Sequence, residues 1–597
     1  MLLLFVTLLT VLAGTPGRAD QPCEDSDIAV VFSSPRTPEP GKRLRAIAVS
    51  ERRFAATLEI LDPNGDPVGE TTERRGGPPY WWYVDVMPQD AGGYRAILQH
   101  GLKQVACRAI DVGTSGDDAH DRAKGIWPVT HDWSLATEDL YSAWIEHLFD
   151  DPLDVEPAWR ALHEVTRDPE RNFLHDHLGL REDDEHGLRL EPDCADLPYF
   201  LRAYFAWKLG LPFGYSECTR GDGGKPPRCS HWRSNLDASL GRGAPLERMQ
   251  MFLGDVGAAA QSGAGRTAGD DDQTDFYPTR LARDTLRPGT VYADPYGHML
   301  VVVRRLPQTA SDGGLLLAVD AQPDGTVARK RYWRGNFLFV HDPTLGSPGF
   351  KHFRPVVISD GGGLRLLTND EIGRDQDYGD FDLEQDKLKT EAFYDRVDAV
   401  LTPRPQDPTR ALQATLDALE EQVHARVRSI ANGEDYVAKH PDVIAMPDGA
   451  AIFETSGPWE DFATPARDLR LLIAIDVARA FPEKVTSRPE RFTLPAGYSP
   501  DDVGTELKGL LERELASRHL DYTRSDGSTW RLSLADVVER APNLEIAYNP
   551  NDCVEMRWGA PPRSKESETC RRHAPDEQTE RMRRYREWFS ARRRPPR

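Results

Sequence analysis

The chain has 597 residues, 39% of them hydrophobic, which is enough for several domains with buried cores. Its 96 acidic residues outnumber the 74 basic ones, giving a formal net charge of −22. This charge argues against binding of nucleic acid or of an anionic membrane surface as the main role.

Residues 1–19 have the pattern of a secretory signal peptide. Leu2 to Ala13 is almost entirely apolar, and Gly17-Arg18-Ala19 places small residues at the −3 and −1 positions of a cleavage site. An apolar stretch of about a dozen residues is too short to span a bilayer, and no later stretch is long and apolar enough to do so. The sequence predicts a secreted or periplasmic protein without a transmembrane helix beyond the signal. A retained N-terminal anchor is the alternative.

Seven cysteines in an exported chain favour disulfides and leave one thiol over. Nearest-neighbour pairing joins Cys23 to Cys107, Cys218 to Cys229, and Cys553 to Cys570, and leaves Cys194 unpaired. Because sequence alone does not fix connectivity, Cys194 could instead be a buried structural cysteine or pair with Cys218 or Cys229.

Residues 23–112 predict a β-sandwich domain. Short strand-like runs alternate with turn signals such as Asp62-Pro63-Asn64-Gly65, a spacing typical of two packed sheets. The expected strands are residues 28–32, 43–49, 55–61, 81–87 and 94–100. The stretch Asp90-x-Gly92-x-Tyr94 resembles the tyrosine corner of immunoglobulin-like domains, which implies an immunoglobulin-like sandwich. We interpret the aromatic run 80–83 as core packing rather than as a sugar- or peptide-stacking patch.

A second domain is expected over residues 125–360, with an insertion at 216–285. The Gly- and Asp-rich tracts at 254–272 indicate a mobile segment within that insertion. Two helices are expected near its start, one capped by Ser134 and one over residues 157–165. His175, Asp176 and His177 and the acidic run 183–186 are possible metal ligands, but no zinc-binding spacing is present. We assign no metal and no cofactor.

This domain is organised around the helix that follows Cys194. Its apolar side chains recur at helical spacing, and Gly210 with Pro212 ends it. The apolar positions are Leu197, Phe200, Leu201, Tyr204, Phe205 and Leu209. Pro198 fits the first turn, so the helix must begin within a few residues of Cys194. The thiol therefore lies at the positive end of a helix dipole, where a nucleophilic thiolate is favoured.

Two more polar residues stand at strands of the same domain. His298 opens the apolar run 299–303, which we expect to be a buried central strand. Asp320 ends the next apolar run, 315–319, and is placed to hold an imidazole on the neighbouring strand. His341 is an alternative imidazole.

A cysteine at a helix start, a histidine at a strand and an acid on the next strand form the arrangement of papain-like thiol enzymes. The imidazole takes the thiol proton, and the third group fixes its orientation. The segment resembles NlpC-type cell-wall cysteine peptidases in Asp193-Cys194, in the Leu209–Pro212 helix end and in Gly297-His298 before an apolar strand.

The same segment also resembles transglutaminase-like peptidases in its Cys194-x-Asp196 start, in Arg202-Ala203 and in Asp320. Either resemblance implies a papain-like α+β domain. Cys194 would be the nucleophile, His298 the base and Asp320 the orienting group.

Residues 385–597 predict a mostly helical C-terminal domain with a basic tail. Helical spacing recurs over residues 411–430, 459–480 and 501–519, and the charged stretch 380–389 reads as a domain boundary. The tail carries Arg581, Arg583, Arg584, Arg586 and residues 592–594. It could bind an anionic polymer, although a solvated helix end is the simpler interpretation.

Together these patterns predict an exported multidomain cysteine hydrolase. It would cleave amide or peptide bonds through a thioester, with an extracellular or cell-wall peptide as substrate. One alternative is a transglutaminase-like acyl transferase. The other is a non-catalytic adhesion or scaffold protein, in which Cys194 would be disulfide-bonded or buried away from His298.

Overall fold

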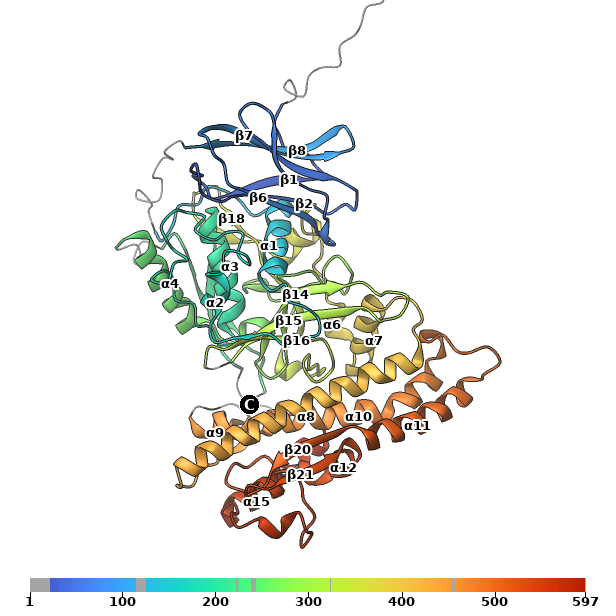
Figure 1. The fold of residues 1–597 in the computed structure, drawn as a ribbon. Coiled ribbons are helices and arrows are strands. Elements are labelled where there is room, and N and C mark those ends of the chain that lie inside the picture. The colour runs from blue at the N-terminus through green and yellow to red at the C-terminus, as the bar shows by residue number, and fades with distance from the viewer. Residues whose placement is uncertain are drawn as a thin grey trace, which may run out of the picture.

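The computed structural model describes residues 22–113, 125–221, 224–237, 243–322, 324–453, 455 and 457–595. The expected signal peptide, residues 1–19, lies outside the described residues. The described chain forms a mixed α/β structure of three units in sequence order: two small sheets, a seven-stranded sheet covered by helices, and a group of long helices (Figure 1).

Two four-stranded antiparallel sheets make up the first unit, and side chains from both fill one shared core. The first, in the order β1-β2-β6-β5, contains β1 Val30–Ser34, β2 Leu44–Ser50, β6 Tyr80–Val86 and β5 Arg75–Gly76. The second, in the order β4-β3-β7-β8, contains β4 Pro67–Thr71, β3 Thr57–Leu61, β7 Gly92–His100 and β8 Lys103–Val112. The Tyr94 hydroxyl donates to the Asp90 carbonyl at 3.1 Å. A disulfide joins Cys23 to Cys107 of β8.

The aromatic run in β6 holds the first unit against the second. Successive strand residues face opposite sides, so Trp82 enters the sandwich core while Trp81 points toward helix α1 (Leu135–Leu148). The Trp81 indole N–H donates to Glu146 of α1 at 2.9 Å in a buried contact. The run therefore serves packing, as its composition indicated.

The second unit is built on a seven-stranded sheet in which every paired neighbour is antiparallel. In sheet order its strands are β12 Phe276–Pro278, β17 Gly349–Phe353, β13 Val291–Ala293, β14 Met299–Leu306, β15 Leu315–Ala321, β16 Val327–Arg331 and β9 Ala158–Trp159. Two antiparallel strand pairs and two short helices accompany it: β10 Gly214–Cys218 with β11 Cys229–Ser234, β18 Val356–Ile358 with β19 Leu364–Leu366, α5 Asn369–Arg374 and α6 Glu384–Lys387. The Cys218–Cys229 disulfide ties β10 to β11.

Helices cover both faces of this sheet, which explains the unbroken apolar run in β14. Met299, Val301 and Val303 belong to the core shared with α1, with α3 (Asp196–Leu209) and with α4 (Pro245–Ala259). Leu300 and Val302 face the opposite core. That second core is closed by α7 (Thr390–Leu401), so α7 belongs to the central unit although the charge pattern placed a boundary before it.

Two other segments differ from their sequence patterns. Residues 157–165 were expected to be one helix, but Trp159 pairs with Val327 as the sheet's edge strand, and α2 spans only Leu162–Thr166. Strand pairing with a distant segment overrides the local helical spacing here. In the insertion, α4 buries Phe252 and Val256 in the main core, so this part of 216–285 is packed structure.

The third unit begins with α8 (Pro408–Lys439) and has its own core. Its long helices, α8, α10 and α11, lie below the central unit in Figure 1. The remaining elements are α9 Pro458–Phe462, α10 Pro465–Ser487, α11 Pro500–Ser517, β20 His519–Thr523, β21 Thr529–Ser533, α12 Leu534–Glu539, α13 Ala541–Leu544, α14 Val554–Arg557 and α15 Asp576–Ser590. The Cys553–Cys570 disulfide joins the residue that precedes α14 to the segment between α14 and α15. Within the described residues, no helix has both the length and the apolar character needed to cross a membrane.

Candidate active site

The start of α3 is set by Asp193. Its Oδ1 accepts the backbone N–H groups of Ala195 at 2.7 Å and Asp196 at 3.1 Å, and its carbonyl accepts the N–H of Leu197 at 3.0 Å. These are the bonds of a helix N-cap residue. Cys194 therefore lies in the turn that leads into α3, two residues before Asp196; it is half-buried, and it is the free thiol among the described cysteines.

The body of α3 is fixed firmly in the core. The side chains from Leu197 to Phe205 on its sheet-facing side are buried, and Gly210 ends it in the left-handed conformation with φ 64°. Near its carboxyl end, the Lys208 ammonium is buried and bonds Glu182 at 2.6 Å and Asp183 at 2.5 Å. A helix held at both ends keeps the position of Cys194 constant.

His298 and Asp320 are brought together by strand register. β14 and β15 pair Val301 with Val319, which makes His298 and Asp320 diagonal neighbours on one face. The imidazole Nε2 lies 2.9 Å from Asp320 Oδ2. The acid is therefore placed to orient the ring, as expected from the order of the strands.

The turn that carries His298 is braced by Asp294. Its carboxylate is fully buried, and Oδ1 accepts the N–H groups of Tyr296 at 2.7 Å and His298 at 2.9 Å. Gly297 lies between them with φ 97°, a conformation that favours glycine. Sequence reasoning did not single out Asp294, although an aspartate two residues before a turn residue is a common Asx-turn signal.

The thiol and the imidazole face each other across this turn. Cys194 Sγ lies 3.9 Å from the carbonyl oxygen of Gly297. Burial lowers the pKa of His298, but the charge of Cys194 and hydrogen bonds with Asp320 and Cys194 outweigh it and raise that pKa to about 10. Because Nε2 is engaged by Asp320, Nδ1 is the ring nitrogen left for the sulfur. The three residues named from the sequence therefore converge.

Asp320 has further partners that the sequence did not reveal. Its side chain is 2% exposed, Gln322 donates to Oδ2 at 3.2 Å, and Lys330 lies 3.9 Å from Oδ1. Burial raises the pKa of Asp320, but Lys330, His298 and Arg470 together hold it below its usual value. Lys330 could have been found from the pairing of β15 with β16. Arg470 comes from α10 of the third unit, and nothing in its local sequence indicates this role.

The donors available to an oxyanion are fewer than the helix start suggests. The N–H groups of Ala195 and Asp196 already donate to Asp193. Among the described residues, no acceptor lies within hydrogen-bond range of the Cys194 N–H, so this donor is available at the nucleophile itself. Of the backbone N–H groups at the helix start, that of Cys194 is thus the one left to donate to an oxyanion.

Asp196 does not share the thiol's surroundings. A Cβ added to Gly257 of α4 would lie 3.3 Å from its Oδ2, so the side chain faces α4. Burial, and then the charge of Asp193, raises the pKa of Asp196 to about 7.

Two of the carboxylates considered as metal ligands, Asp176 and Asp183, belong to an ion-pair cluster that also contains Glu182. Asp176, Glu182 and Asp183 converge within 4.8 Å, but Lys208 already bonds two of them and supplies the positive charge. Two ligand atoms of a second group, Cys553 and Cys570, are joined in a disulfide. His341, the alternative imidazole, is exposed.

Comparison of the chain with family models, with curated proteins and with solved structures finds no match.

Proposed function

We propose that this protein is a cysteine hydrolase of amide or peptide bonds. The observation that carries the proposal is the convergence of a free thiol at a helix start with an imidazole bonded to a buried carboxylate. Nucleophilic cysteine enzymes require a nucleophile, a base within reach and a group that orients the base. Cys194, His298 and Asp320 would fill these roles.

The reaction would proceed in two steps. The Cys194 thiolate attacks the carbonyl carbon, and the N–H of Cys194 donates to the developing oxyanion. The C–N bond breaks as the imidazolium of His298 gives its proton to the leaving amine, which leaves a thioester. His298 then takes a proton from water, the hydroxide attacks the thioester, and the acid is released as the thiolate and imidazolium re-form.

The surrounding architecture also supports a proposal for the fold families, the location and the substrate class of this protein. We assign the central unit to a papain-like α+β fold, near the NlpC-type and transglutaminase-like branches, because the thiol, imidazole and acid occur in that order on a helix and two adjacent strands. The Tyr94–Asp90 hydrogen bond supports an immunoglobulin-like first unit. Three disulfides are compatible with a secreted or periplasmic location and with an extracellular or cell-wall peptide as substrate.

The experiment is digestion of a peptide mixture prepared from cell walls and extracellular proteins, in water enriched in ¹⁸O. A hydrolase generates new amino termini and carboxyl groups that carry ¹⁸O. An acyl transferase would instead join peptides without isotope uptake, and a scaffold protein would do neither.

The matched variants are Cys194→Ala, which we expect to abolish ¹⁸O uptake, and His341→Ala, which we expect to leave it unchanged because His341 is exposed. Equal ¹⁸O uptake by Cys194→Ala and the unmodified protein would show that another site performs the hydrolysis.

A further inference from the structure

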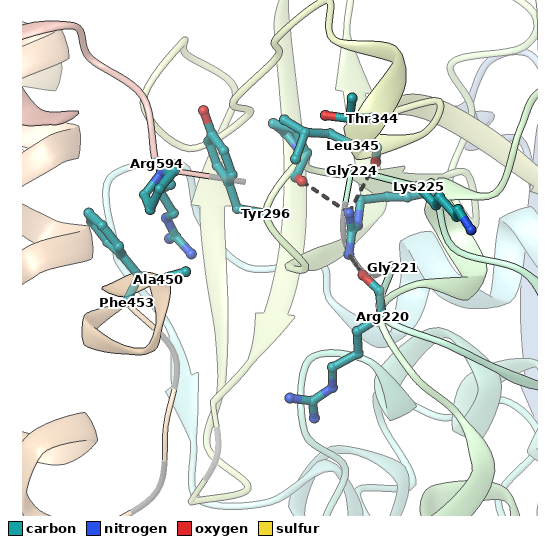
Figure 2. A pocket seen from close by; sticks show the side chains of 13 residues that line it. Arg220, Gly221, Gly224, Lys225, Tyr296, Thr344, Leu345, Ala450, Phe453 and Arg594 are labelled. Carbon is teal, nitrogen blue, oxygen red and sulfur yellow. Dashed lines mark hydrogen bonds between the residues drawn. The ribbon is translucent and has the colours of Figure 1, made fainter. Parts of the chain in front are cut away.

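A cavity lies where the end of the chain meets the central unit. Figure 2 shows Arg220 and Lys225 on one side of it, and Arg594 with Phe453 on the other, with Tyr296 among its walls. In Figure 1 the C-terminus runs back between the central unit and the long helices. Two units of the protein therefore build this cavity together.

The lining is strongly cationic. Four of the thirteen residues that line the cavity are basic: Arg220, Lys225, Arg266 and Arg594. None of the described lining residues is acidic. This concentration of positive charge stands out in a chain whose net charge is −22.

Arg266 is a buried cation that forms no ion pair with a carboxylate of the described residues. It is 3% exposed, and its guanidinium donates to the carbonyl oxygens of Pro295 at 3.1 Å, Leu345 at 3.1 Å and Arg220 at 3.2 Å. Its Nε is buried and has no hydrogen-bond partner in the described structure. Burial lowers the pKa of Arg266 to about 10, against the opposing effect of Asp294. A buried guanidinium without a counter-charge is stabilised when an anion binds to it.

Arg594 differs from the other arginines near the end of the chain. Arg586 and Arg592 form ion pairs with carboxylates of their own unit at 2.7 Å and 2.6 Å. Arg594 instead lies over the rings of Tyr296 and Phe453, 5.1 Å from each centroid, and its buried Nε has no partner in the described structure. Among the described arginines of the tail, Arg581, Arg583, Arg586 and Arg592 are thus ion-paired, whereas Arg594 lines the cavity.

Two described carboxylates act on these cations without lining the cavity. Asp294 accepts the N–H groups of Tyr296 and His298 through Oδ1, and Glu460 accepts the N–H of Thr455 at 2.7 Å. They offset part of the positive charge but do not occupy the cavity. Guanidinium groups around a confined space favour a carboxylate or phosphate oxygen, which can accept several charged hydrogen bonds at once.

The cavity is adjacent to the catalytic groups. Tyr296 precedes His298 by two residues, so their Cα atoms are at most about 7 Å apart, and Gly297 between them contacts the Cys194 sulfur. We propose that this cavity binds an oxyanion of the substrate, a carboxylate or a phosphate, one or two residues from the amide that Cys194 attacks. The placement of the anion on the substrate rests on the proposed hydrolase function, whereas anion binding itself does not.

The test is calorimetric titration of the full-length protein with inorganic phosphate and with propionate at fixed ionic strength. We expect one site, weakened about tenfold or more in the double variant Lys225→Gln/Arg594→Gln, because charged hydrogen bonds are lost. The charge-matched control is Arg374→Gln/Arg583→Gln, at exposed positions away from the cavity, and it should bind as the unmodified protein does. Arg594→Lys, which keeps the charge, should bind more tightly than Arg594→Gln.

Each outcome is decisive. Binding of propionate alone supports a substrate carboxylate, binding of phosphate alone supports a phosphate ester, and binding of both supports the shared oxyanion site. No binding of either anion, or equal binding by the cavity variant and its control, overturns the proposal. Iodoacetamide labelling of Cys194 in the same samples reports separately on the hydrolase site and on folding, so failure of one claim is distinguishable from failure of the other.

Discussion

At the scale of single residues, the proposed chemistry depends on the charges that surround the His298 imidazole. His298 is placed between the sulfur of Cys194 and the buried carboxylate of Asp320, and both favour its charged form. Asp193 uses the N–H groups that would otherwise stabilise a negative charge at the helix start. We infer that the imidazolium of His298, more than the N–H groups of the helix start, is the positive charge that faces the sulfur.

Replacing Asp320 by Asn tests whether the negative charge of Asp320 raises the pKa of His298. The amide keeps the shape but loses the charge, so the pKa of His298 should fall from about 10 toward its ordinary value. Histidine NMR titration measures this change. Asp324→Asn, at an exposed position on the next turn, should leave the His298 pKa unchanged. An unaltered pKa in Asp320→Asn would contradict the role given to that carboxylate.

The raised pKa of His298 also predicts a pH dependence of stability. Its value in the folded protein, about 10, exceeds the ordinary value of 6.5. The charged imidazole therefore contributes stability that is fully present below about pH 6.5 and is lost as the pH rises through 10. The difference in urea midpoint between the unmodified protein and His298→Asn should shrink over this range. A difference in urea midpoint that grows with pH would contradict the raised pKa of His298 in the folded protein.

At the scale of elements, α3 positions the proposed nucleophile, Cys194, and the two ends of this helix were predictable from local signals. Asp193, Pro198 and Gly210 specify where the helix begins and ends, because capping and left-handed conformations depend on residue type. The partner of Trp159 was not predictable, because strand pairing at a sheet edge depends on a segment far along the chain. The same holds for α7, whose apolar face gives no indication of which core it joins.

Gly210 offers a test of how the helix end is fixed. Alanine there would adopt a left-handed conformation, and its Cβ would lie 2.2 Å from the Thr130 hydroxyl. We expect Gly210→Ala to destabilise the protein by about 2–4 kcal/mol. Gly527→Ala, also at positive φ but with open space around its Cβ, should cost only about 1 kcal/mol. Denaturant unfolding of the pair compares them, and equal effects would contradict the close approach to Thr130.

At the scale of the whole molecule, the third unit takes part in the site. Arg470 influences Asp320, and Arg594 lies over the ring of Tyr296 beside the turn that carries His298. The sequence placed Cys194, His298 and Asp320 in the right order, because strand order and helix caps leave local signals. The arginines depend on how two units dock, which no local pattern encodes.

Three disulfides and one free thiol account for the seven cysteines of the chain. Protein unfolded without reductant should take up one iodoacetamide, at Cys194, and after reduction it should take up seven. Mass spectrometry of the intact protein counts the additions. Two or more additions before reduction would mean that at least one of the three disulfides does not form.

The most direct test of the account is the rate at which iodoacetamide alkylates Cys194 in the native protein at pH 6.5. The account predicts a rate above that of free cysteine, because the imidazolium stabilises the thiolate, and a rate in His298→Ala at or below that of free cysteine. An inert Cys194, or equal rates in the two proteins, would contradict it.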